Sequence, residues 1–472
     1  MMMKFPLFSL LAAVSSVFAA QVQVLGINDM HANVDDLPQL ATYVQSARAT
    51  DPDVLLLSAG DNRTGNPYVD NGEHPGVPMI KLMNMLGFDL STLGNHEFDT
   101  GRQGLQSTLD AANFGFVCAN VRADGGAELN LKPYHIFERD GVRIGVLGLV
   151  QVGANGIPDI HPDNAKGICF RNPHEVVRDY AYLRAQCDVL ILLTHLGFED
   201  DLKLARMFPE ADAIIGGHTH TRVENGYWEN GVLVTQAENK VKYITRLTFD
   251  VEDGKVLAKK AELVPLQHLA KDAAVAAEVE KIKTSPYMSR QLTTIANDIT
   301  RRESLGCLMA DALRAYAKTD VAIVNFGNVR LESFPAGPFT VADCYRLDPF
   351  CNQTVIFKAT GRELIDFLNA IPATDHHGAP CVSGMRYKAV KPAAELQPMR
   401  ITEASLADGT PIAPDAVYTV ATNSYLMSTV TPQPADTGEA CDMDGARAIL
   451  QFMDGREPVD YSDVSHRDVT IE

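Results

Sequence analysis

Short apolar runs recur along the first half of the chain, and each ends in a polar or glycine-rich segment. The runs are rich in Val, Ile and Leu, which is typical of buried β-strands, and helical stretches separate them. We therefore expect an α/β or sheet-on-sheet core with its chemistry at the strand ends. The runs with their endings are QVQVLGIND (21–29), DVLLLSAGD (53–61), FDLSTLGN (88–95), FGFVCAN (114–120), VRIGVLGLV (142–150), CDVLILLTH (187–195), ADAIIGGH (211–218) and VLVTQAE (232–238).

The pattern changes after YITRLTFDVEDGKVL (243–257), which predicts an edge hairpin. HLAKDAAVAAEVEKIKTS (268–285) is rich in Ala, Glu and Lys and predicts an amphipathic helix between two domains. A second α/β pattern follows, and a chain of 472 residues, 46% of them hydrophobic, is long enough for two cores. We predict a catalytic domain over 20–266, a linker helix over 267–290 and a C-terminal domain over 291–472.

The N-terminus has one lysine, an apolar run from Phe5 to Phe18, and then small residues. This pattern predicts a secretory signal over residues 1–19, because the run is too short for a spanning helix. No later segment approaches the length of a membrane span, so we expect an exported protein, periplasmic or extracellular, with no integral membrane segment. Its eight cysteines can then pair, and Cys344 with Cys351 is one candidate.

The formal net charge is −19, and its long-range field argues against a nucleic-acid polymer or an anionic membrane as partner. Such acidity also keeps an exported protein soluble without any partner. Small anions stay compatible with it where cations are held locally.

The polar endings of five runs carry candidate metal ligands. Oxygen and imidazole donors from separate turns suit one or two divalent ions of the zinc, manganese or iron(II) kind, unlike a thiolate site or a calcium cage. A single histidine after a strand is more often a hydrogen-bonding residue, but five such turns in one half of the chain favour a metal site. The polar residues are Asp29, His31, Asp61, Asn95, His96, His195, His218 and His220.

Two of these turns place candidate ligands two residues apart. If the segments are extended, Asp29 shares a face with His31, and His218 shares a face with His220. On this basis we expect each pair to converge.

The order D-x-H, GD, GNHE, TH, GHTH resembles the calcineurin-like metallophosphoesterases, and GNHEFD with the downstream segments resembles their 5'-nucleotidase branch. The N-terminal resemblance runs from about Val22 to Leu266. It implies an α/β (α+β) fold: a four-layer β-sandwich flanked by helices, followed by a smaller mixed α/β C-terminal domain. It also implies two divalent metal ions, whose identity (Zn, Mn, Co or Fe) the sequence leaves open.

The resemblance implies a role for each matching residue. His96 and Asp99 match a catalytic His-Asp dyad, in which the carboxylate orients the imidazole. A turn or helix N-cap is the alternative for Asp99, and Glu97 has no assigned role. The implied ligands are Asp29, His31 and His220 for the first metal, Asn95, His195 and His218 for the second, and Asp61 for both.

Residues about 292–452 resemble the family's nucleotide-binding domain. NFGNVR (325–330) is similar to N-G-G-G-[IV]-R, DPFCN to the P-F-G-N loop and TNSYLM to T-N-D-F-L, so the resemblance implies an aromatic clamp on the base. Such stacking is worth about 1–3 kcal/mol per base. The implied substrate-binding residues are Asn120, Arg301, Arg302, Asn325, Gly327, Arg330, Phe350 and Tyr425.

Two departures affect this half. ITRRESLGC (299–307) is one residue shorter than the family's R-x-x-E-[CST]-N-[LM]-G-N and lacks both asparagines, which leaves the choice between Arg301 and Arg302 open. The family's ribose-contacting aspartate has no direct match; Asp436, Asp442 and Asp444 are the alternatives.

These expectations describe an exported enzyme that hydrolyses nucleoside monophosphates to nucleoside and phosphate. The alternatives are a 2',3'-cyclic-nucleotide phosphodiesterase or 3'-nucleotidase, a UDP-sugar hydrolase, a thiosulfate-ester hydrolase and an inactive nucleotide-binding or surface-interaction protein. The expected partner is a small nucleotide, and the oligomeric state stays open.

Overall fold

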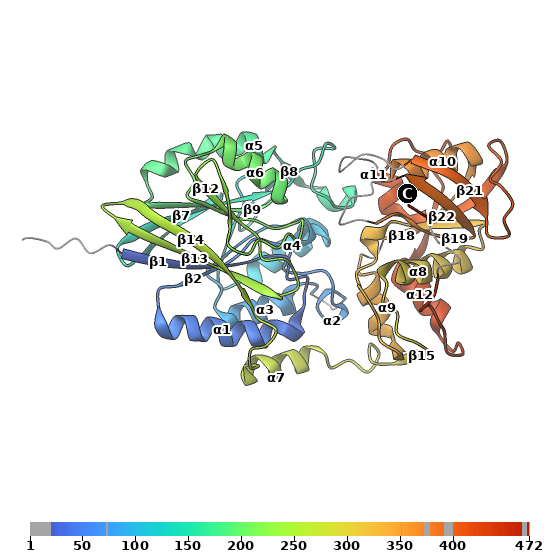
Figure 1. The fold of residues 1–472 in the computed structure, drawn as a ribbon, viewed down its shortest axis with the longest axis horizontal. Helices are drawn as coiled ribbons and strands as arrows, with labels where there is room; N and C mark the ends of the chain where they lie inside the picture. Colours follow the sequence, from blue (N-terminus) through green and yellow to red (C-terminus); the bar gives the residue numbers. More distant parts are fainter. Residues whose placement is uncertain are drawn as a thin grey trace, which may run out of the picture.

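Two domains lie side by side in the computed structural model, which describes residues 20–71, 74–350, 352–371, 378–390, 400–464 and 470–471 (Figure 1). The N-terminal domain runs from blue to green and the C-terminal domain from yellow to red. The predicted signal 1–19 and Cys351 lie outside the described residues. Within those residues, no helix combines the length and apolar character that a membrane span needs.

Two six-stranded sheets form the centre of the N-terminal domain. The runs β1–β2–β3–β4 and β7–β9–β10–β12 are parallel, with β4 at one edge of the first sheet, and antiparallel strands form the other three edges. The first sheet has the order β14 (Lys255–Pro265), β13 (Tyr243–Glu252), β1 (Ala20–Ile27), β2 (Leu55–Ser58), β3 (Leu90–Thr92), β4 (Gly115–Val117). The second has the order β11 (Tyr227–Glu229), β12 (Val232–Thr235), β10 (Ala213–Ile215), β9 (Val189–His195), β7 (Val142–Val150), β6 (Tyr134–Arg139).

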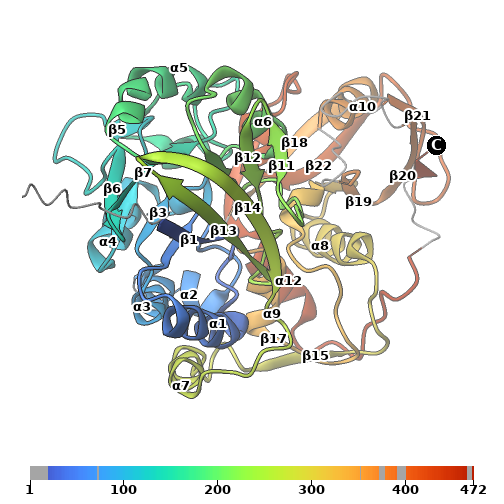
Figure 2. The ribbon, with the colours of Figure 1, turned by 60° about the vertical axis from the view of Figure 1, so that its left-hand side comes forward.

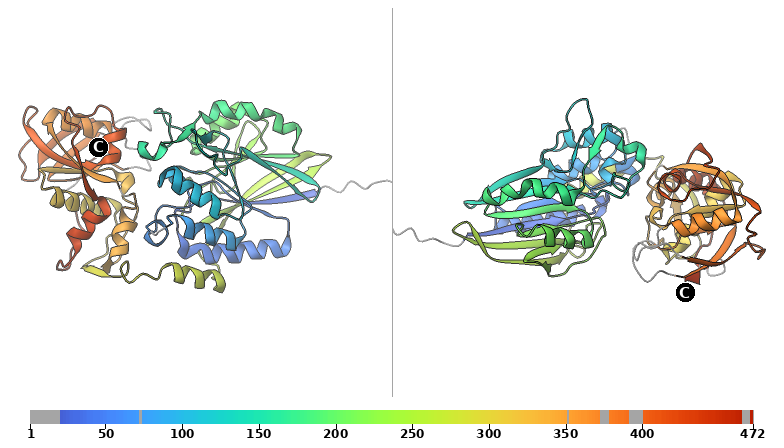
Figure 3. Two further views of the ribbon diagram at one scale, coloured as in Figure 1. Left: turned by 180° about the vertical axis from the view of Figure 1, so that it is seen from behind. Right: turned by 90° about the horizontal axis from the view of Figure 1, so that it is seen from above.

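Buried side chains from both sheets meet in one core, which includes Val24, Leu57, Ile144 and Ile191. Helices cover both outer faces, so the layers run helix, sheet, sheet, helix (Figure 3). This arrangement confirms the predicted four-layer α/β sandwich. The first helix layer contains α1 (Leu37–Thr50), α3 (Val77–Leu86) and α4 (Gly101–Ala111), and the second α5 (Pro173–Val176), η4 (Val177–Ala185) and α6 (Phe198–Met207).

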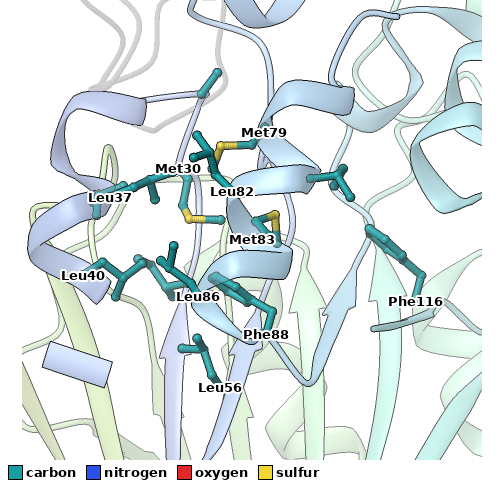
Figure 4. Packing of buried hydrophobic residues seen from close by; sticks show 14 of the residues in the cluster. Met30, Leu37, Leu40, Leu56, Met79, Leu82, Met83, Leu86, Phe88 and Phe116 are labelled. Atoms are coloured by element: carbon teal, nitrogen blue, oxygen red, sulfur yellow. The ribbon is translucent and has the colours of Figure 1, made fainter. Parts of the chain in front are cut away.

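The face under α1 and α3 is packed with long apolar side chains (Figure 4). Met30 follows β1, Leu56 comes from β2, and Met83 and Leu86 come from α3, all of them at most 5% exposed. Close packing of this kind holds the strands in fixed positions, and the loops at their ends are therefore carried on a rigid base.

The predicted linker contains helix α7 (Ala273–Ile282), which packs beside α1 (Figures 1 and 2). Val275 and Val279 join the core of the N-terminal domain, and the N–H of Asp272 donates to the carbonyl of Pro38 at 3.0 Å. The helix is therefore anchored to the first domain, and the segment 283–290 makes the connection to the second.

The C-terminal domain contains a five-stranded sheet between two cores. Helices α8 (Arg302–Ala317), α9 (Val341–Leu347) and α12 (Gly445–Met453) pack on one face, and α10 (Gly361–Ala370) with the β20–β21 hairpin (Met385–Val390, Arg400–Leu406) on the other. This mixed α/β unit also agrees with the predicted fold. The sheet order is β19 (Cys381–Ser383), β16 (Val321–Val324), β22 (Val417–Asn423), β18 (Gln353–Thr360), β23 (Glu439–Asp444).

Candidate active site

The candidate ligands lie at the ends of strands β1, β2, β3, β9 and β10 or a few residues beyond them, and the strand ends bring them to one edge of the sandwich. We expected these segments to be extended, but in the structure they are not. Asp29, His31, Asp61, His218 and His220 all have positive φ, between 46° and 80°. Left-handed turns at the strand ends, rather than the alternation of an extended strand, therefore make the side chains converge.

Three groups of side chains bring their ligand atoms within 4.8 Å of one another. Asp29 and Asp61 link the groups, and both are almost fully buried, at 0% and 2% exposure. The groups are Asp29 with His31 and His220, Asp29 with Asp61 and His195, and His31 with Asp61 and His96.

His218 and His220 diverge instead of sharing one side of their turn. His220 Nε2 lies 3.0 Å from His31 Nε2 and 3.3 Å from Asp29 Oδ1. His218 Nδ1 lies 3.0 Å from Asn95 Oδ1, and its ring centroid is 5.3 Å from that of His195. The expectation that the two histidines share one face was wrong, because they enter the common cluster on different sides, as in the two ligand sets that the resemblance implies.

Two buried ligand atoms have no hydrogen-bond partner among the described residues, Asp29 Oδ1 and His195 Nε2. They face each other at 3.8 Å, and His195 Nε2 lies 3.2 Å from Asp61 Oδ2. Buried polar atoms of native proteins are normally paired, and a cation held between these two would supply a partner for both. Carboxylate, imidazole and amide donors fit divalent transition ions, and this set of residues fits such ions.

The electrostatics of the site also favour a cation. Burial raises the pKa of Asp61, but His195 and His96 outweigh it and hold that pKa well below its usual range. Burial lowers the pKa of His195, but Asp61 and Asp29 outweigh it and raise the pKa to about 10. The same negative potential that retains a proton on His195 attracts a metal ion.

His96 is oriented by Asp99. His96 Nδ1 lies 2.8 Å from Asp99 Oδ2, and Nε2 is 3.9 Å from Asp61 Oδ2, on the side of the ligand set. Burial lowers the pKa of His96, whereas Asp99 and Asp61 raise it, with a net value of about 8. Asp99 thus has a side-chain partner in the site, beyond the turn that it ends.

Glu97, which the sequence left without a role, holds two of the strand ends together. It is fully buried, and its carboxylate accepts from the N–H groups of Asp61 (2.9 Å), Asn62 (2.8 Å) and Gly94 (2.6 Å). The N–H of His96 donates in turn to Asp61 Oδ1 at 2.9 Å. No sequence signal distinguishes this structural carboxylate from a ligand, because only the fold aims the three N–H groups at it.

The C-terminal domain brings three of its predicted substrate residues onto the first domain, and two of them, Arg330 and Phe350, contact the histidines of the site. The Arg330 guanidinium lies 3.2 Å from both ring nitrogens of His31. The Phe350 ring stacks on His96 with centroids 5.6 Å apart and planes at 29°. A cation with five donors and an aromatic face therefore lie against the ligand set and the dyad.

Two residues at the junction of the domains, Asp159 and Lys240, were not predicted from the sequence. The Tyr425 hydroxyl donates to Asp159 of the first domain, whose carbonyl accepts from Asn95 Nδ2 at 3.3 Å. Lys240 Nζ donates to the carbonyl of Arg330 at 3.1 Å, and burial with Arg330 lowers the pKa of Lys240 to about 8. Both Asp159 and Lys240 lie in loops with no motif to mark them.

The remaining predicted substrate residues have other hydrogen-bond or packing partners among the described residues. The Asn120 amide is used by backbone groups of Val150 and Arg171. Arg302 packs over Phe326 and donates to the carbonyls of Val329 and Phe326, whereas the half-exposed Arg301 pairs with Glu303. Asn325 accepts from Asn423 at 3.0 Å, and Gly327 lies in the short turn Phe326–Asn328.

The three aspartates considered for the ribose have local roles in the structure. Asp436 accepts from the N–H groups of Lys358 and Gly438, and Asp444 caps helix α12. Asp442 is an exposed partner of Arg447. The choice among them stays a prediction.

A four-layer sandwich with two carboxylates, four imidazoles and an amide at its strand ends defines the class of metallophosphoesterases. The chain matches the calcineurin-like phosphoesterase family over residues 22–222 and the 5'-nucleotidase C-terminal domain over residues 278–432. It belongs to the family that joins these two domains.

Several named proteins are similar to this chain. Endonuclease YhcR of Bacillus subtilis is 30% identical over 86% of this chain and 37% of its own, and a 5'-nucleotidase of Vibrio cholerae is 28% identical over 67% of this chain and 68% of its own. The crystal structure of a 5'-nucleotidase precursor from Thermus thermophilus superposes with a TM-score of 0.82 at 25% identity, over 96% of this chain and 99% of its own. The chain spans about a third of the length of the first curated relatives it matches.

Proposed function

We propose that the protein is a dinuclear-metal phosphohydrolase that cleaves nucleoside 5'-monophosphates to nucleoside and phosphate. The contact between the two domains at the candidate active site supports this proposal. Arg330 and Phe350 of the second domain lie against His31 and His96 of the first, so a phosphate donor site and an aromatic face meet at the ligand set.

Seven residues would hold the metals. Asp29, His31 and His220 would hold one ion, Asn95, His195 and His218 the other, and Asp61 both. When bound, two such ions supply Lewis-acid charge to a phosphate oxygen and activate a water molecule.

His96 would move the proton in this reaction. Asp99 accepts from Nδ1–H and leaves Nε2 directed toward the ligand set. The oxygen of water would form the new bond to phosphorus, and the bond between phosphorus and the 5' oxygen would break. Nε2–H of His96 would donate its proton to that leaving oxygen, while a proton of the attacking water would pass to solvent, from which His96 is reprotonated. Arg330 would bind a phosphate oxygen, and Phe350 would stack on the base.

A substrate panel tests the proposal. AMP, UMP, 3'-AMP, 2',3'-cyclic AMP and UDP-glucose would be incubated with the metal-reconstituted protein, and phosphate release scored with and without an added phosphatase. We expect direct release from AMP and UMP. Release from neither contradicts the proposal.

A phosphodiesterase is the second candidate, because the relative YhcR is named an endonuclease and endonucleases cleave phosphodiesters. Turnover of 2',3'-cyclic AMP or UDP-glucose ahead of AMP would favour it. An inactive nucleotide-binding protein would instead bind AMP, contain fewer than one metal per chain and show no rescue by manganese, cobalt or zinc.

We also propose export to the periplasm or the cell exterior, because residues 1–19 carry the pattern of a secretory signal. N-terminal sequencing of the protein from its native host is expected to begin at Ala20. A mature protein that begins at Met1 and stays in the cytoplasm contradicts this.

A further inference from the structure

Thr64 lies in an unusual backbone conformation next to the dyad. It is 2% exposed and has a φ of 69°, in the left-handed region that β-branched residues rarely adopt. Such a conformation persists only where the surrounding contacts determine it, and it is concentrated at functional sites. The contacts of this residue therefore identify what it does.

A buried ion pair holds the segment around Thr64 in place. The Asp70 carboxylate accepts from the N–H groups of Thr64 (3.1 Å), Gly65 (2.9 Å) and Asn66 (2.8 Å). Arg63 pairs with Asp70 at 3.5 Å and donates to the Thr100 hydroxyl at 2.8 Å. Because Thr100 directly follows Asp99, this network fixes Thr64 relative to the dyad.

Thr64 contacts the dyad and the ligand set with two different groups. Its hydroxyl donates to Asp99 Oδ2 at 2.7 Å, the same oxygen that lies 2.8 Å from His96 Nδ1. Its carbonyl oxygen lies 3.1 Å from His31 Nδ1. The hydroxyl therefore contacts Asp99, and the backbone carbonyl contacts His31.

We propose that Thr64 is a positioning residue that acts through its hydroxyl, which holds the Asp99 carboxylate in the rotamer that orients His96. The proposal rests on the proposed phosphohydrolase function. The Asp99 side chain is 20% exposed, so without the hydroxyl it is free to turn toward water and leave Nδ1 of His96 without its acceptor. A proton donor with a misdirected ring loses rate in the chemical step more than it loses substrate affinity.

Two substitutions separate the hydroxyl from the backbone. Thr64→Val keeps the β-branch, the volume and the carbonyl that faces His31 but removes the hydroxyl, and Thr64→Ser keeps the hydroxyl. We expect Thr64→Val to lower kcat by about 10- to 100-fold with KM within about threefold of wild type, the range of general acid–base and positioning effects. Metal affinity, measured by chelator competition, is expected to be unchanged in both, and Thr64→Ser is expected to recover most of kcat.

A second readout does not depend on turnover. In the metal-free protein labelled with ¹⁵N-histidine, the His96 Nδ1–H signal of wild type and Thr64→Ser should be lost or shifted in Thr64→Val. If Thr64→Val is too unstable to assay, Thr64→Ala against Thr64→Ser gives the same comparison.

A double-mutant cycle with Asp99→Asn tests whether Thr64 acts through Asp99, since coupled residues give non-additive effects. Equal losses in Thr64→Val and Thr64→Ser, fully additive losses in the cycle, or an unchanged His96 signal in Thr64→Val would overturn the proposal. Failure of wild type to release phosphate from every substrate counts against the phosphohydrolase function, whereas the His96 signal still reports on Thr64.

Discussion

Four consecutive residues, Gly94 to Glu97, have four different environments. Gly94 passes so close to Asp61 that a side chain has no room, and Asn95 points its amide at His218. His96 is held by Asp99, and Glu97 is turned inward onto backbone N–H groups. These neighbours thus have different parts in the structure. Gly94 and Glu97 support the fold, Asn95 is a candidate metal ligand, and His96 belongs to the dyad.

Asn95→Ala and His96→Ala are expected to separate metal binding from chemistry. Loss of Asn95 removes a ligand oxygen and should lower metal affinity in chelator competition. Loss of His96 should leave metal content near wild type and lower kcat by about 10²- to 10⁴-fold, the usual range for a lost general acid. Full turnover of His96→Ala at saturating metal would contradict the dyad.

Glu97→Gln is expected to destabilise the protein by about 1–3 kcal/mol, because the amide nitrogen has no acceptor among the N–H groups that face it. Urea denaturation measures the change. Glu210→Gln, an exposed position on the same domain, is the matched control. Equal stability of the two variants would show that Glu97 is not the link between the strand ends.

At the scale of elements, the strands determine where the candidate ligands lie, and the turns determine the direction in which their side chains point. Parallel strands bring five ends to one edge, and left-handed residues at those ends aim the ligands. Two glycines allow the turns to touch. A Cβ on Gly217 would lie 2.7 Å from His195 Nδ1, and one on Gly94 would lie 2.2 Å from Asp61 Oδ1.

Gly94→Ala is expected to lower metal affinity at least about tenfold, because the new methyl group meets the Asp61 carboxylate and backbone, and misplacement by about 1 Å has effects of this size or larger. Isothermal titration with manganese measures it. Gly115→Ala is the control, since its Cβ meets only the end of the Leu90 side chain at 2.9 Å. Wild-type affinity in Gly94→Ala would contradict the close approach.

At the scale of the whole molecule, several side-chain contacts between the domains fall on the candidate active site. His31 meets Arg330, His96 meets Phe350, and Asp159 meets Tyr425. Since α7 is anchored to the first domain, relative motion of the domains would pass through 283–290. Under the proposed function, a nucleotide that binds at this junction would require these contacts to open.

Tyr425→Phe is expected to favour a more open arrangement, because it keeps the ring but removes the hydroxyl that donates to Asp159. A hydrogen bond to a charged group contributes about 1.5–3 kcal/mol. Small-angle scattering should show a larger radius of gyration. Tyr227→Phe, at an exposed tyrosine of the first domain, is the control, and identical scattering of both variants would exclude a role for the contact.

Apolar runs and polar endings are local patterns, so the sequence alone was enough to predict the buried strands and the polar residues that follow them. The four-layer class came from the resemblance to calcineurin-like phosphoesterases, and the assignment of ligands to metals stays a prediction. The sequence predicted the right convergence of Asp29 and His31 for a wrong reason, since positive φ values depend on how each strand end meets its neighbours. Glu97, Asp159, Lys240 and Thr64 gained their contacts only in the tertiary structure. Their partners lie on other turns or on the other domain. A hydrogen bond between segments far apart in the chain cannot be recognised from the sequence around either residue.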